Sequence, residues 1–402
     1  MQYRTDKKSG NRLSVLGLGC MRFPRNMGAI DMKKTETLVM RAIEGGINYF
    51  DTAYIYPGSE EALGAVLAKN GVREKVFIAA KLPIMLVKER ADIDRFFNKE
   101  LERLRTDYID YYLMHQLTDT GFWGRLKDLG IEEWIAAQKK SGRIRQAGFS
   151  FHGTRDEFLK LVDVYPWDFC QIQYNYSDEN FQAGLAGLKK ASAVMPVIIM
   201  EPLLGGKLIE GLPREAAAIF KKANPHAGLA AWGLNWVWNH TDVTLLLSGM
   251  STEAQLEENL RLADTSAPGM LGPLELDVYR QVLKVFNKFY KIHCTGCNYC
   301  MPCPHGVNIP GCFAGYNLSY SMGYIVGLKH YITSIAAVSE KIAGAGLCVK
   351  CGKCEKICPQ RIPIIRSLED VVKRMEPFWY RWVIGAVRFF LLGNNIRKKN
   401  LK

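Results

Sequence analysis

The sequence of 402 residues lacks low-complexity segments, and its first residues lack the apolar core of a signal peptide. These first residues, MQYRTDKK, are charged, so we expect no export and a cytoplasmic location. Basic and aromatic residues do not interleave as in known nucleic-acid recognition motifs, which argues against a nucleic-acid partner. No flavin-binding motif is recognisable, so a bound flavin stays open as a possibility that no motif supports. Hydrophobic residues make up 48% and charged residues 23%, proportions that indicate a globular chain.

Excess positive charge is absent from the first two thirds of the chain. Residues 284–402 hold 18 Lys and Arg against 5 Asp and Glu, whereas the preceding residues hold 35 of each kind. The net charge of +13 therefore belongs to the last third. A basic surface of this kind suits an acidic electron carrier or an anionic membrane surface. A basic face that only keeps the chain soluble explains it about as well.

Three apolar runs in the first third of the chain each end on a residue that can handle protons. Asp51 follows the run NYF, Lys81 follows VFIAA and His115 follows YIDYYLM, while Tyr56 lies five residues after Asp51. The carboxyl ends of parallel strands meet at one rim, where α/β folds place their chemistry. We therefore expect these four side chains to lie together.

A carboxylate, a phenol, an ammonium and an imidazole form a coherent acid–base set. Free tyrosine has a pKa of about 10, so it needs a neighbouring cation to act near neutrality. Lys81 would be that cation, Asp51 would fix Lys81, and His115 would orient a substrate oxygen or share the proton. Taken singly, each residue is more often a turn cap, a core residue or a solvated charge. The ordered set of four favours catalysis.

With these residues the chain resembles the aldo-keto reductase family. The resemblance rests on FDTAYIY, AAK at Lys81, LMHQ at His115, GFS at Ser150 and LEEN, and it covers roughly residues 13–270. It implies a hydride transfer between a nicotinamide cofactor, NADP or NAD, and a small carbonyl or alcohol substrate. Tyr56 would be the catalytic acid, supported by the other three residues. The alternative is a redox-sensing or regulatory subunit that binds nicotinamide with little turnover.

The resemblance also implies a set of cofactor-binding residues. Ser150 and Gln171 match the positions that hold the nicotinamide carboxamide, and Met200 stands where relatives have a stacking tyrosine. The adenosine-phosphate end would be bound by Ser248, Ser251, Gln255, Glu258 and Asn259.

Two departures from the family pattern affect the cofactor. Phe151 and His152 follow the serine where many relatives have asparagine. Gly249 and Gln255 stand where strongly NADPH-dependent relatives carry the Lys and Arg that grip a 2′-phosphate. Ser251, Gln255 and backbone N–H groups at a helix start can still bind a phosphate. The choice between NADPH and NADH therefore stays open.

Alternating strand-like and helix-like segments predict a (β/α)8 TIM barrel. After a hairpin over residues 1–14, strands are predicted at 15–20, 49–50, 76–81, 109–115, 146–150, 169–174, 197–200 and 243–248. Helices are predicted at 33–44, 59–70, 91–103, 132–141, 155–162, 183–192 and 228–239. The segment after His115, with Phe122, Trp123 and Trp134, is interpreted as a long loop whose aromatic residues line the substrate or pack on the barrel.

Eight of the eleven cysteines fall in two short runs near the end of the chain. They are Cys294, Cys297, Cys300 and Cys303, then Cys348, Cys351, Cys354 and Cys358. The second run has the bacterial ferredoxin spacing, in which three thiolates hold one cubane and the fourth reaches the neighbouring cluster. The first run is one residue shorter. Both resemble the ferredoxin-type extension of one aldo-keto reductase branch and predict two 4Fe-4S clusters. Zinc is the rival, and disulfides are disfavoured without an export signal.

Three regions are expected along the chain. Residues 1–272 would form the barrel, residues 273–376 a linker helix and a mainly helical ferredoxin-like domain, and residues 377–402 a basic, aromatic helix. Arg381 and Arg388 would share one face of that helix. It is too short and too charged to span a bilayer. Peripheral contact with a membrane and docking onto protein both remain open.

Overall fold

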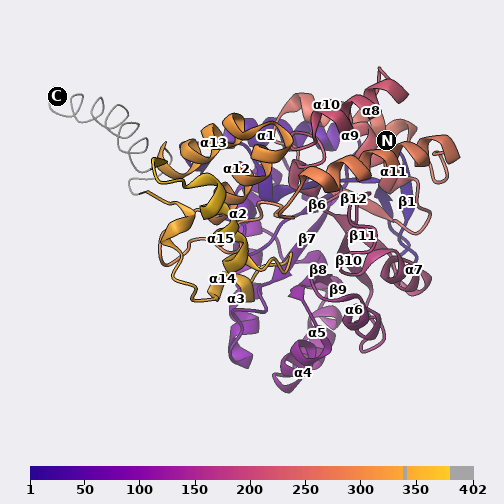
Figure 1. The fold of residues 1–402 in the computed structure, drawn as a ribbon. Helices are drawn as coiled ribbons and strands as arrows, with labels where there is room; N and C mark the ends of the chain where they lie inside the picture. Colours follow the sequence, from indigo (N-terminus) through magenta and orange to yellow (C-terminus); the bar gives the residue numbers. More distant parts are fainter. Residues whose placement is uncertain (338–341, 381–402) are drawn as a thin grey trace, which may run out of the picture. The chain divides into compact units, whose positions relative to one another are not determined.

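The computed structural model of this chain describes residues 1–337 and 342–380, and Figure 1 shows their course. Contacts divide the chain into two units. The first consists of Met1–Leu203 with Ala230–Gly272, and the second of Leu204–Leu229 with the chain from Pro273 onward. Most of the helix predicted at 377–402 lies outside the described residues, so both of its suggested roles stay predictions. Within the described ranges, no helix is long and apolar enough to cross a membrane.

The first unit contains a closed barrel of eight parallel strands, as predicted (Figure 1). Around the barrel the strands run in the order β10, β11, β12, β3, β6, β7, β8 and β9. Their bounds are β3 Leu16–Gly19, β6 Tyr49–Asp51, β7 Phe77–Leu82, β8 Ile109–Leu117, β9 Ile144–Phe151, β10 Phe169–Gln173, β11 Val197–Met200 and β12 Leu245–Ser248. Each strand is buried along most of its length, which explains why the apolar runs identified the strands so directly.

Helices connect the strands, and their ends follow local capping rules. Their bounds are α1 Met32–Glu44, α2 Ser59–Lys69, α3 Arg90–Leu104, α4 Thr120–Asp128, α5 Ile131–Lys140, α6 Arg155–Leu161, α7 Gly184–Val194, α9 Leu229–Trp238 and α10 Glu253–Thr265. Asp31 caps α1 by accepting the Lys34 N–H at 3.1 Å. The α3 helix begins with a capping box between Glu89 and Asp92. Such caps satisfy N–H groups that a helix start leaves without partners.

The segment after β8 differs from its prediction. Residues expected to form a long loop form the helix α4, which Asp119 caps by accepting the Phe122 N–H at 2.7 Å. Trp123 is buried on this helix, 4.7 Å from the ring of Trp167 between centroids. Trp134 is buried on α5 and donates to Asp94 Oδ1 at 2.7 Å. The loop prediction was wrong, and both indoles pack within the first unit.

Two short antiparallel hairpins accompany the barrel. The predicted one pairs β1 Tyr3–Thr5 with β2 Arg12–Ser14 and turns at Gly10, where φ is 78°. A second, which was not predicted, pairs β4 Arg25–Asn26 with β5 Ala29–Ile30.

The second unit is mainly helical, as predicted for the region that carries the cysteines. Its helices are α8 Arg214–Ala223, α11 Pro273–Phe289, α12 Ile309–Ser321, α13 Tyr324–Ile332, α14 Lys353–Lys356 and α15 Ile364–Met375. Phe220 of α8 meets Tyr279 of α11 with 5.6 Å between ring centroids. A Cβ added at Gly327 would lie 2.3 Å from the Ser319 backbone nitrogen, so glycine permits the close approach of α12 and α13. Phe313, Tyr331 and Val371 belong to this unit's own core.

A pair of buried carboxyl groups, Glu60 and Glu100, lies between α2, α3 and β8. Tyr112 donates to Glu100 Oε2 at 2.6 Å, and Arg103 Nη1 donates to Glu60 Oε2 at 3.0 Å. The two carboxyls are close enough for each to shift the pKa of the other. Burial raises the pKa of Glu60 to about 7 against the opposing effect of Arg103. Burial and the charge of Glu60 raise the pKa of Glu100. The folded chain therefore keeps a proton that the unfolded chain has released.

We expect the free energy of unfolding to fall as the pH rises from about 5 to 8. Stability from a raised carboxyl pKa is complete below the unfolded pKa and is lost as the pH passes the folded pKa. Glu100→Gln should flatten this slope by up to about 1.4 kcal/mol per pH unit, the value for one proton. Urea unfolding followed by tryptophan fluorescence at several pH values measures it.

Glu102→Gln, an exposed change on the same helix, is the matched control and should keep the wild-type slope. A Glu100→Gln protein with the wild-type slope would contradict the retention of a proton by this pair in the folded chain.

Candidate active site and metal centre

The four residues predicted for catalysis come together at the carboxyl ends of β6, β7 and β8. Lys81 Nζ donates to Asp51 Oδ1 and to the Thr52 carbonyl oxygen, each at 2.6 Å. The same ammonium lies 5.1 Å from the centre of the Tyr56 ring. That ring lies edge-on to His115, with 6.0 Å between ring centroids. One ammonium is thus held between a carboxylate and a phenol ring.

Burial sets the charges in this group. Lys81 is 1% exposed and Asp51 is 4% exposed. Burial raises the pKa of Asp51, and the Lys81 ammonium opposes the rise. Burial also lowers the pKa of His115 well below its usual range, with further lowering by the charges of Lys81 and His152. The His115 imidazole is therefore neutral near pH 7 and can donate one hydrogen bond and accept another.

Two residues to which the sequence assigned no catalytic part lie beside the four. His152 is close enough to act on the pKa of His115, and burial lowers the pKa of His152 to about 4. Its Nδ1 atom has no hydrogen-bond partner among the described residues. Cys20 is fully buried, and burial followed by the charge of Asp51 raises the pKa of its thiol. The signal for His152 was that Phe151 and His152 follow Ser150 where many relatives have asparagine. Nothing in the sequence singled out Cys20.

The residues predicted to hold the nicotinamide carboxamide lie on three adjacent strands. Ser150 of β9 stands opposite Gln171 of β10, and its Oγ accepts the Gln116 N–H at 2.9 Å. Gln171 Nε2 contacts Met200 Sδ of β11 at 3.6 Å. Gln171 Oε1 is buried and has no partner in the part of the chain that the structure describes. An acceptor of this kind fits the N–H group of a primary amide.

The residues predicted for the adenosine-phosphate end lie on β12 and the first turns of α10. Asn259 Nδ2 donates to Ser248 Oγ at 3.0 Å, and both side chains are buried. Gln255 Oε1 accepts the Ser251 N–H at 2.9 Å. Glu258 is half-buried on α10. The helix start therefore has an ordered polar surface, and backbone N–H groups at such a start favour phosphate.

A cation that the sequence did not reveal lies at this end. A Cβ added at Gly249 would be 3.0 Å from Arg22 Cδ, so the Arg22 side chain fills the space beside this glycine. Gly249 is the position where NADPH-dependent relatives were expected to carry lysine. Arg22 lies at the end of the short helix η1, Cys20–Arg22. Because Arg22 is more than 200 residues from Gly249 in the sequence, no local motif could join them.

The two cysteine runs fold into loops with matching backbone conformations. Positive φ angles occur at three equivalent pairs: Gly296 and Lys350, Asn298 and Gly352, and Gly306 and Arg361. In both loops the third residue after the last cysteine donates its N–H to that cysteine's carbonyl oxygen, at 2.9 Å and 3.0 Å. Left-handed residues direct successive N–H groups to one side, an arrangement suited to anionic acceptors such as cluster sulfurs. The runs are an internal repeat.

One cavity of the second unit is lined by cysteines from both runs. Cys294, Cys297 and Cys300 come from the first run, and Cys358 comes from the second. Burial, then the charges of its three cysteine neighbours, raises the pKa of Cys300 to about 12. Three ligands from one run and a fourth from the other is the pattern that ferredoxin spacing implies.

The other four cysteines of the two runs are Cys303, Cys348, Cys351 and Cys354, and none of them lines this cavity. Cys348 lies near enough to Cys354 to affect its pKa, and both pack against the core of this unit together with Cys303. Cys351 is exposed. None of the eleven cysteines forms a disulfide. Across residues 1–337 and 342–380, no group of three His, Cys, Asp or Glu side chains could hold a single metal ion.

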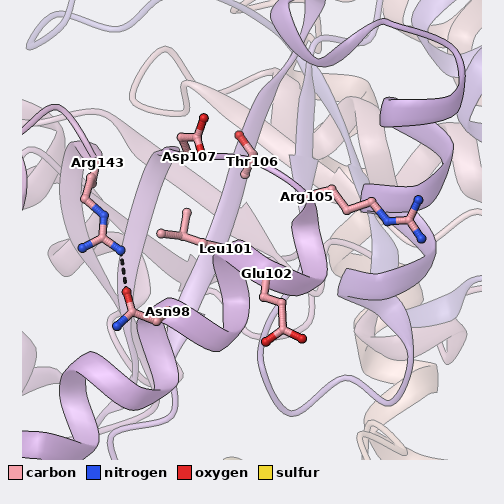
Figure 2. A pocket seen from close by; sticks show the side chains of 7 residues that line it. All are labelled: Asn98, Leu101, Glu102, Arg105, Thr106, Asp107 and Arg143. Carbon is pink, nitrogen blue, oxygen red and sulfur yellow. Dashed lines mark hydrogen bonds between the residues drawn. The ribbon is translucent and has the colours of Figure 1, made fainter.

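A separate hollow of about 480 Å³ lies at the C-terminal end of α3, away from every predicted site residue. Figure 2 shows Arg143 bonded to Asn98 on one side of it and Arg105 on the other. Glu102 and Asp107 also line it, so charges of both signs meet there. The hollow belongs to the end of the barrel opposite to Lys81 and His115.

Comparison with known proteins assigns both parts of the chain. Residues 15–268 match the aldo/keto reductase family, and residues 293–362 match the 4Fe-4S dicluster domain. The protein is therefore an oxidoreductase with a barrel and an iron–sulfur domain. It belongs to the aldo/keto reductase family, which confirms the predicted family and fold.

Similar proteins cover the barrel. Methylglyoxal reductase YeaE of Escherichia coli is 29% identical over 268 residues, which are 61% of this chain and 89% of that protein. An aldo-keto reductase of Mycolicibacterium vanbaalenii is 28% identical and covers 63% of this chain and 84% of its own length. The solved structure of a Bacillus halodurans aldo-keto reductase in its holo form has a TM-score of 0.58 at 23% identity, covering 70% of this chain and 96% of that one. At that identity the likeness concerns the fold alone.

We expect Cys300→Ser and Cys358→Ser to perturb the same iron–sulfur centre, because both residues line one cavity. Electron paramagnetic resonance of the anaerobically purified, dithionite-reduced protein should show the same altered signal in both variants. Cys351→Ser should alter a different signal.

Cys312→Ser is the control, because Cys312 is buried beside Tyr331 and does not line the cavity. It should retain the wild-type spectrum and iron content. If Cys358→Ser reproduced the spectrum of Cys351→Ser instead, the shared cavity would not correspond to a shared centre.

Proposed function

We propose that this protein is an NAD(P)H-dependent reductase of small carbonyl compounds with an attached electron-transfer domain. The observation that carries the proposal is the buried Lys81 ammonium, held by Asp51 and placed against the Tyr56 ring. An ammonium in that position stabilises the negative charge that a phenol oxygen develops as it gives up its proton. The name of the Escherichia coli relative makes methylglyoxal a sensible first substrate to assay.

Binding of a nicotinamide is supported by the polar set on β9, β10 and β11. When bound, the cofactor supplies a hydride to the carbonyl carbon or accepts one from the alcohol. The unpaired Gln171 Oε1 would accept a hydrogen bond from its carboxamide, and the Ser150 hydroxyl would donate one. Met200 would pack on the ring through its thioether.

In this proposal each of the four residues at the strand ends has one task. Tyr56 donates the proton to the substrate oxygen, and Lys81 stabilises the resulting charge. Asp51 keeps Lys81 in place through the bond at 2.6 Å. The neutral His115 donates a hydrogen bond to the same substrate oxygen and thereby orients the carbonyl group.

At the phosphate end we propose that Arg22 supplies the positive charge that the glycine at position 249 cannot. Its side chain lies over that glycine, next to the start of α10. An arginine there favours NADPH over NADH, because a guanidinium binds a phosphate through charge-assisted hydrogen bonds. Ser248, Ser251, Gln255, Glu258 and Asn259 complete this end of the proposed cofactor site.

For the second unit we propose two 4Fe-4S clusters. The internal repeat of the two cysteine loops supports the number of two clusters. The cavity lined by cysteines of both runs supports a cluster whose fourth ligand comes from the other run. The clusters would lie outside the hydride path, because a nicotinamide delivers two electrons as hydride whereas a cluster takes one electron at a time. Cysteines that remain free thiols suit a reducing compartment, and we propose that the protein is located in the cytoplasm.

Tyr56→Phe tests the assignment of the acid. Loss of a general acid should lower kcat by about 10² to 10⁴, while the KM for NADPH stays within about threefold of the wild type. Steady-state reduction of methylglyoxal and a panel of aldehydes and quinones provides the measurement.

The control is Tyr54→Phe, a neighbouring tyrosine whose ring packs on Phe96 and Arg103 instead of Lys81. It should retain the wild-type kcat. An unchanged kcat for Tyr56→Phe on the best substrate would disprove the assignment.

Arg22→Gln tests the proposed phosphate contact. We expect the KM for NADPH to rise about tenfold or more, the effect of one lost charge-assisted hydrogen bond, with kcat and the KM for NADH little changed. Lys69→Gln removes another exposed charge, on α2, where Lys69 pairs with Glu36, and serves as the control. Equal effects of Arg22→Gln on NADPH and NADH would place Arg22 away from the 2′-phosphate.

A further inference from the structure

The two cysteine loops share a backbone but differ in their exposure to solvent. Thr295 and Val349 occupy matching positions, each directly after the first cysteine of its run. Thr295 is 1% exposed, whereas Val349 is 57% exposed. The larger apolar side chain therefore stands at the solvent-facing position, the reverse of what solvation alone favours.

Two further apolar side chains near Val349 in the sequence are also exposed to solvent. Leu347 is 42% exposed and Ile357 is 40% exposed, whereas residues 291–310 around the first run contribute no large exposed hydrophobic side chain. Single exposed apolar residues are ordinary, but three within eleven residues of one loop form a local apolar surface.

The two cysteine loops also differ in their charged residues. Between its first and last cysteines the second run carries Lys350, Lys353, Lys356 and one acid, Glu355, while the first run carries no charged residue. Since the first loop adopts the same backbone without lysines, the lysines are not needed to form such a loop. Glu355 accepts the Ile365 N–H at 2.8 Å, which ties its carboxylate to the start of α15.

Exposed apolar and basic side chains thus surround one cysteine. We define the Cys351 patch as Leu347, Val349, Lys350, Lys353, Lys356 and Ile357. Cys351 itself is exposed, whereas the four cysteines of the first run are only partly exposed. A cluster bound through Cys351 would therefore have a ligand at the molecular surface, where an electron can enter or leave.

We propose that the Cys351 patch is the docking surface for a small acidic protein that carries one electron at a time. The inference rests on the proposed iron–sulfur function of the second unit and adds its partner. Redox complexes are small, with interfaces below about 1,200 Å², and a few apolar contacts ringed by charge suffice for them. The lysines steer an acidic carrier into place and fix its orientation.

Charge and shape favour an acidic protein over an anionic membrane. The apolar side chains of the patch are Leu347, Val349 and Ile357, without the aromatic residues and broad apolar face of a membrane-bound helix. The ion pair of Lys350 with Glu369 is exposed at the surface and contributes little energy, so a partner carboxylate competes with it easily.

The exchange balances as a one-electron reaction. The reduced carrier is oxidised by one electron, the iron–sulfur centre beside Cys351 is reduced by one electron, and no bond or proton changes hands. The reverse transfer oxidises the centre and reduces the carrier.

Binding of the anaerobically purified holoprotein to an acidic [2Fe–2S] ferredoxin and to a flavodoxin provides the test. Isothermal titration should give a Kd for at least one of them that weakens between about 50 and 300 mM salt, as screened charges require. Lys353→Glu/Lys356→Glu should weaken that Kd about tenfold or more. Val349→Ser should weaken it with little change in salt dependence.

Lys221→Glu/Lys222→Glu on α8 makes the same charge change at two exposed lysines of the same unit and is the matched control. It should bind the carrier as the wild type does. Iron and sulfide content and NADPH-dependent carbonyl reduction are measured on every variant, so that loss of a cluster or of barrel activity is distinguished from loss of docking.

Several outcomes would overturn the proposal. They are a wild-type protein that binds neither acidic carrier, a patch variant with full iron content that binds as tightly as the wild type, and a control pair that weakens binding equally. Cosedimentation of the wild type with phosphatidylglycerol vesicles, lost in the patch variant and not accompanied by carrier binding, would assign the patch to a membrane surface instead.

Discussion

The first unit depends on one buried ion pair. Lys81 and Asp51 are both almost inaccessible to solvent, and the ammonium also donates to the Thr52 carbonyl oxygen. Removing one partner of a buried pair costs about 3–5 kcal/mol, because the other charge is left uncompensated. The barrel makes the pair possible by register: Asp51 stands opposite Ala79, and Lys81 lies two residues farther along the same face of β7. The same ammonium lies 5.1 Å from the centre of the Tyr56 ring, so in the proposed reaction this ion pair would also prepare the phenol.

Repetition organises the second unit. Two cysteine loops have left-handed residues at equivalent positions, and each loop is followed by a helix, α12 or α15. Their environments differ, since Thr295 is buried where Val349 is exposed. In the proposal of two clusters, a repeat with one buried and one exposed loop would give centres that differ in their access to solvent.

The proposed function separates two kinds of electron chemistry along one chain. In that proposal the acid–base group of the barrel moves a proton together with a hydride, which involves no unpaired electron. The second unit holds thiols suited to clusters that exchange single electrons. The excess of positive charge follows the same division, because the residues before 284 are balanced and the remainder carry all of it. Each unit therefore has the surface and the interior that its own chemistry requires.

The sequence by itself determined the barrel, the four residues at its strand ends and the two cysteine runs. Buried parallel strands appear as continuous apolar runs, and the spacing of thiols that bind one cluster is fixed by local backbone geometry, so both signals are local. Local signals failed at α4, where Gly121 and Gly124 obscured a helix whose Trp123 is held by packing on Trp167. Only the tertiary structure decided that Arg22 lies beside Gly249, that His152 lies near His115, and which of the two similar cysteine loops faces solvent. These contacts join positions far apart in the chain, and burial is a property of the assembled fold, so no periodicity or spacing along the sequence encodes them directly.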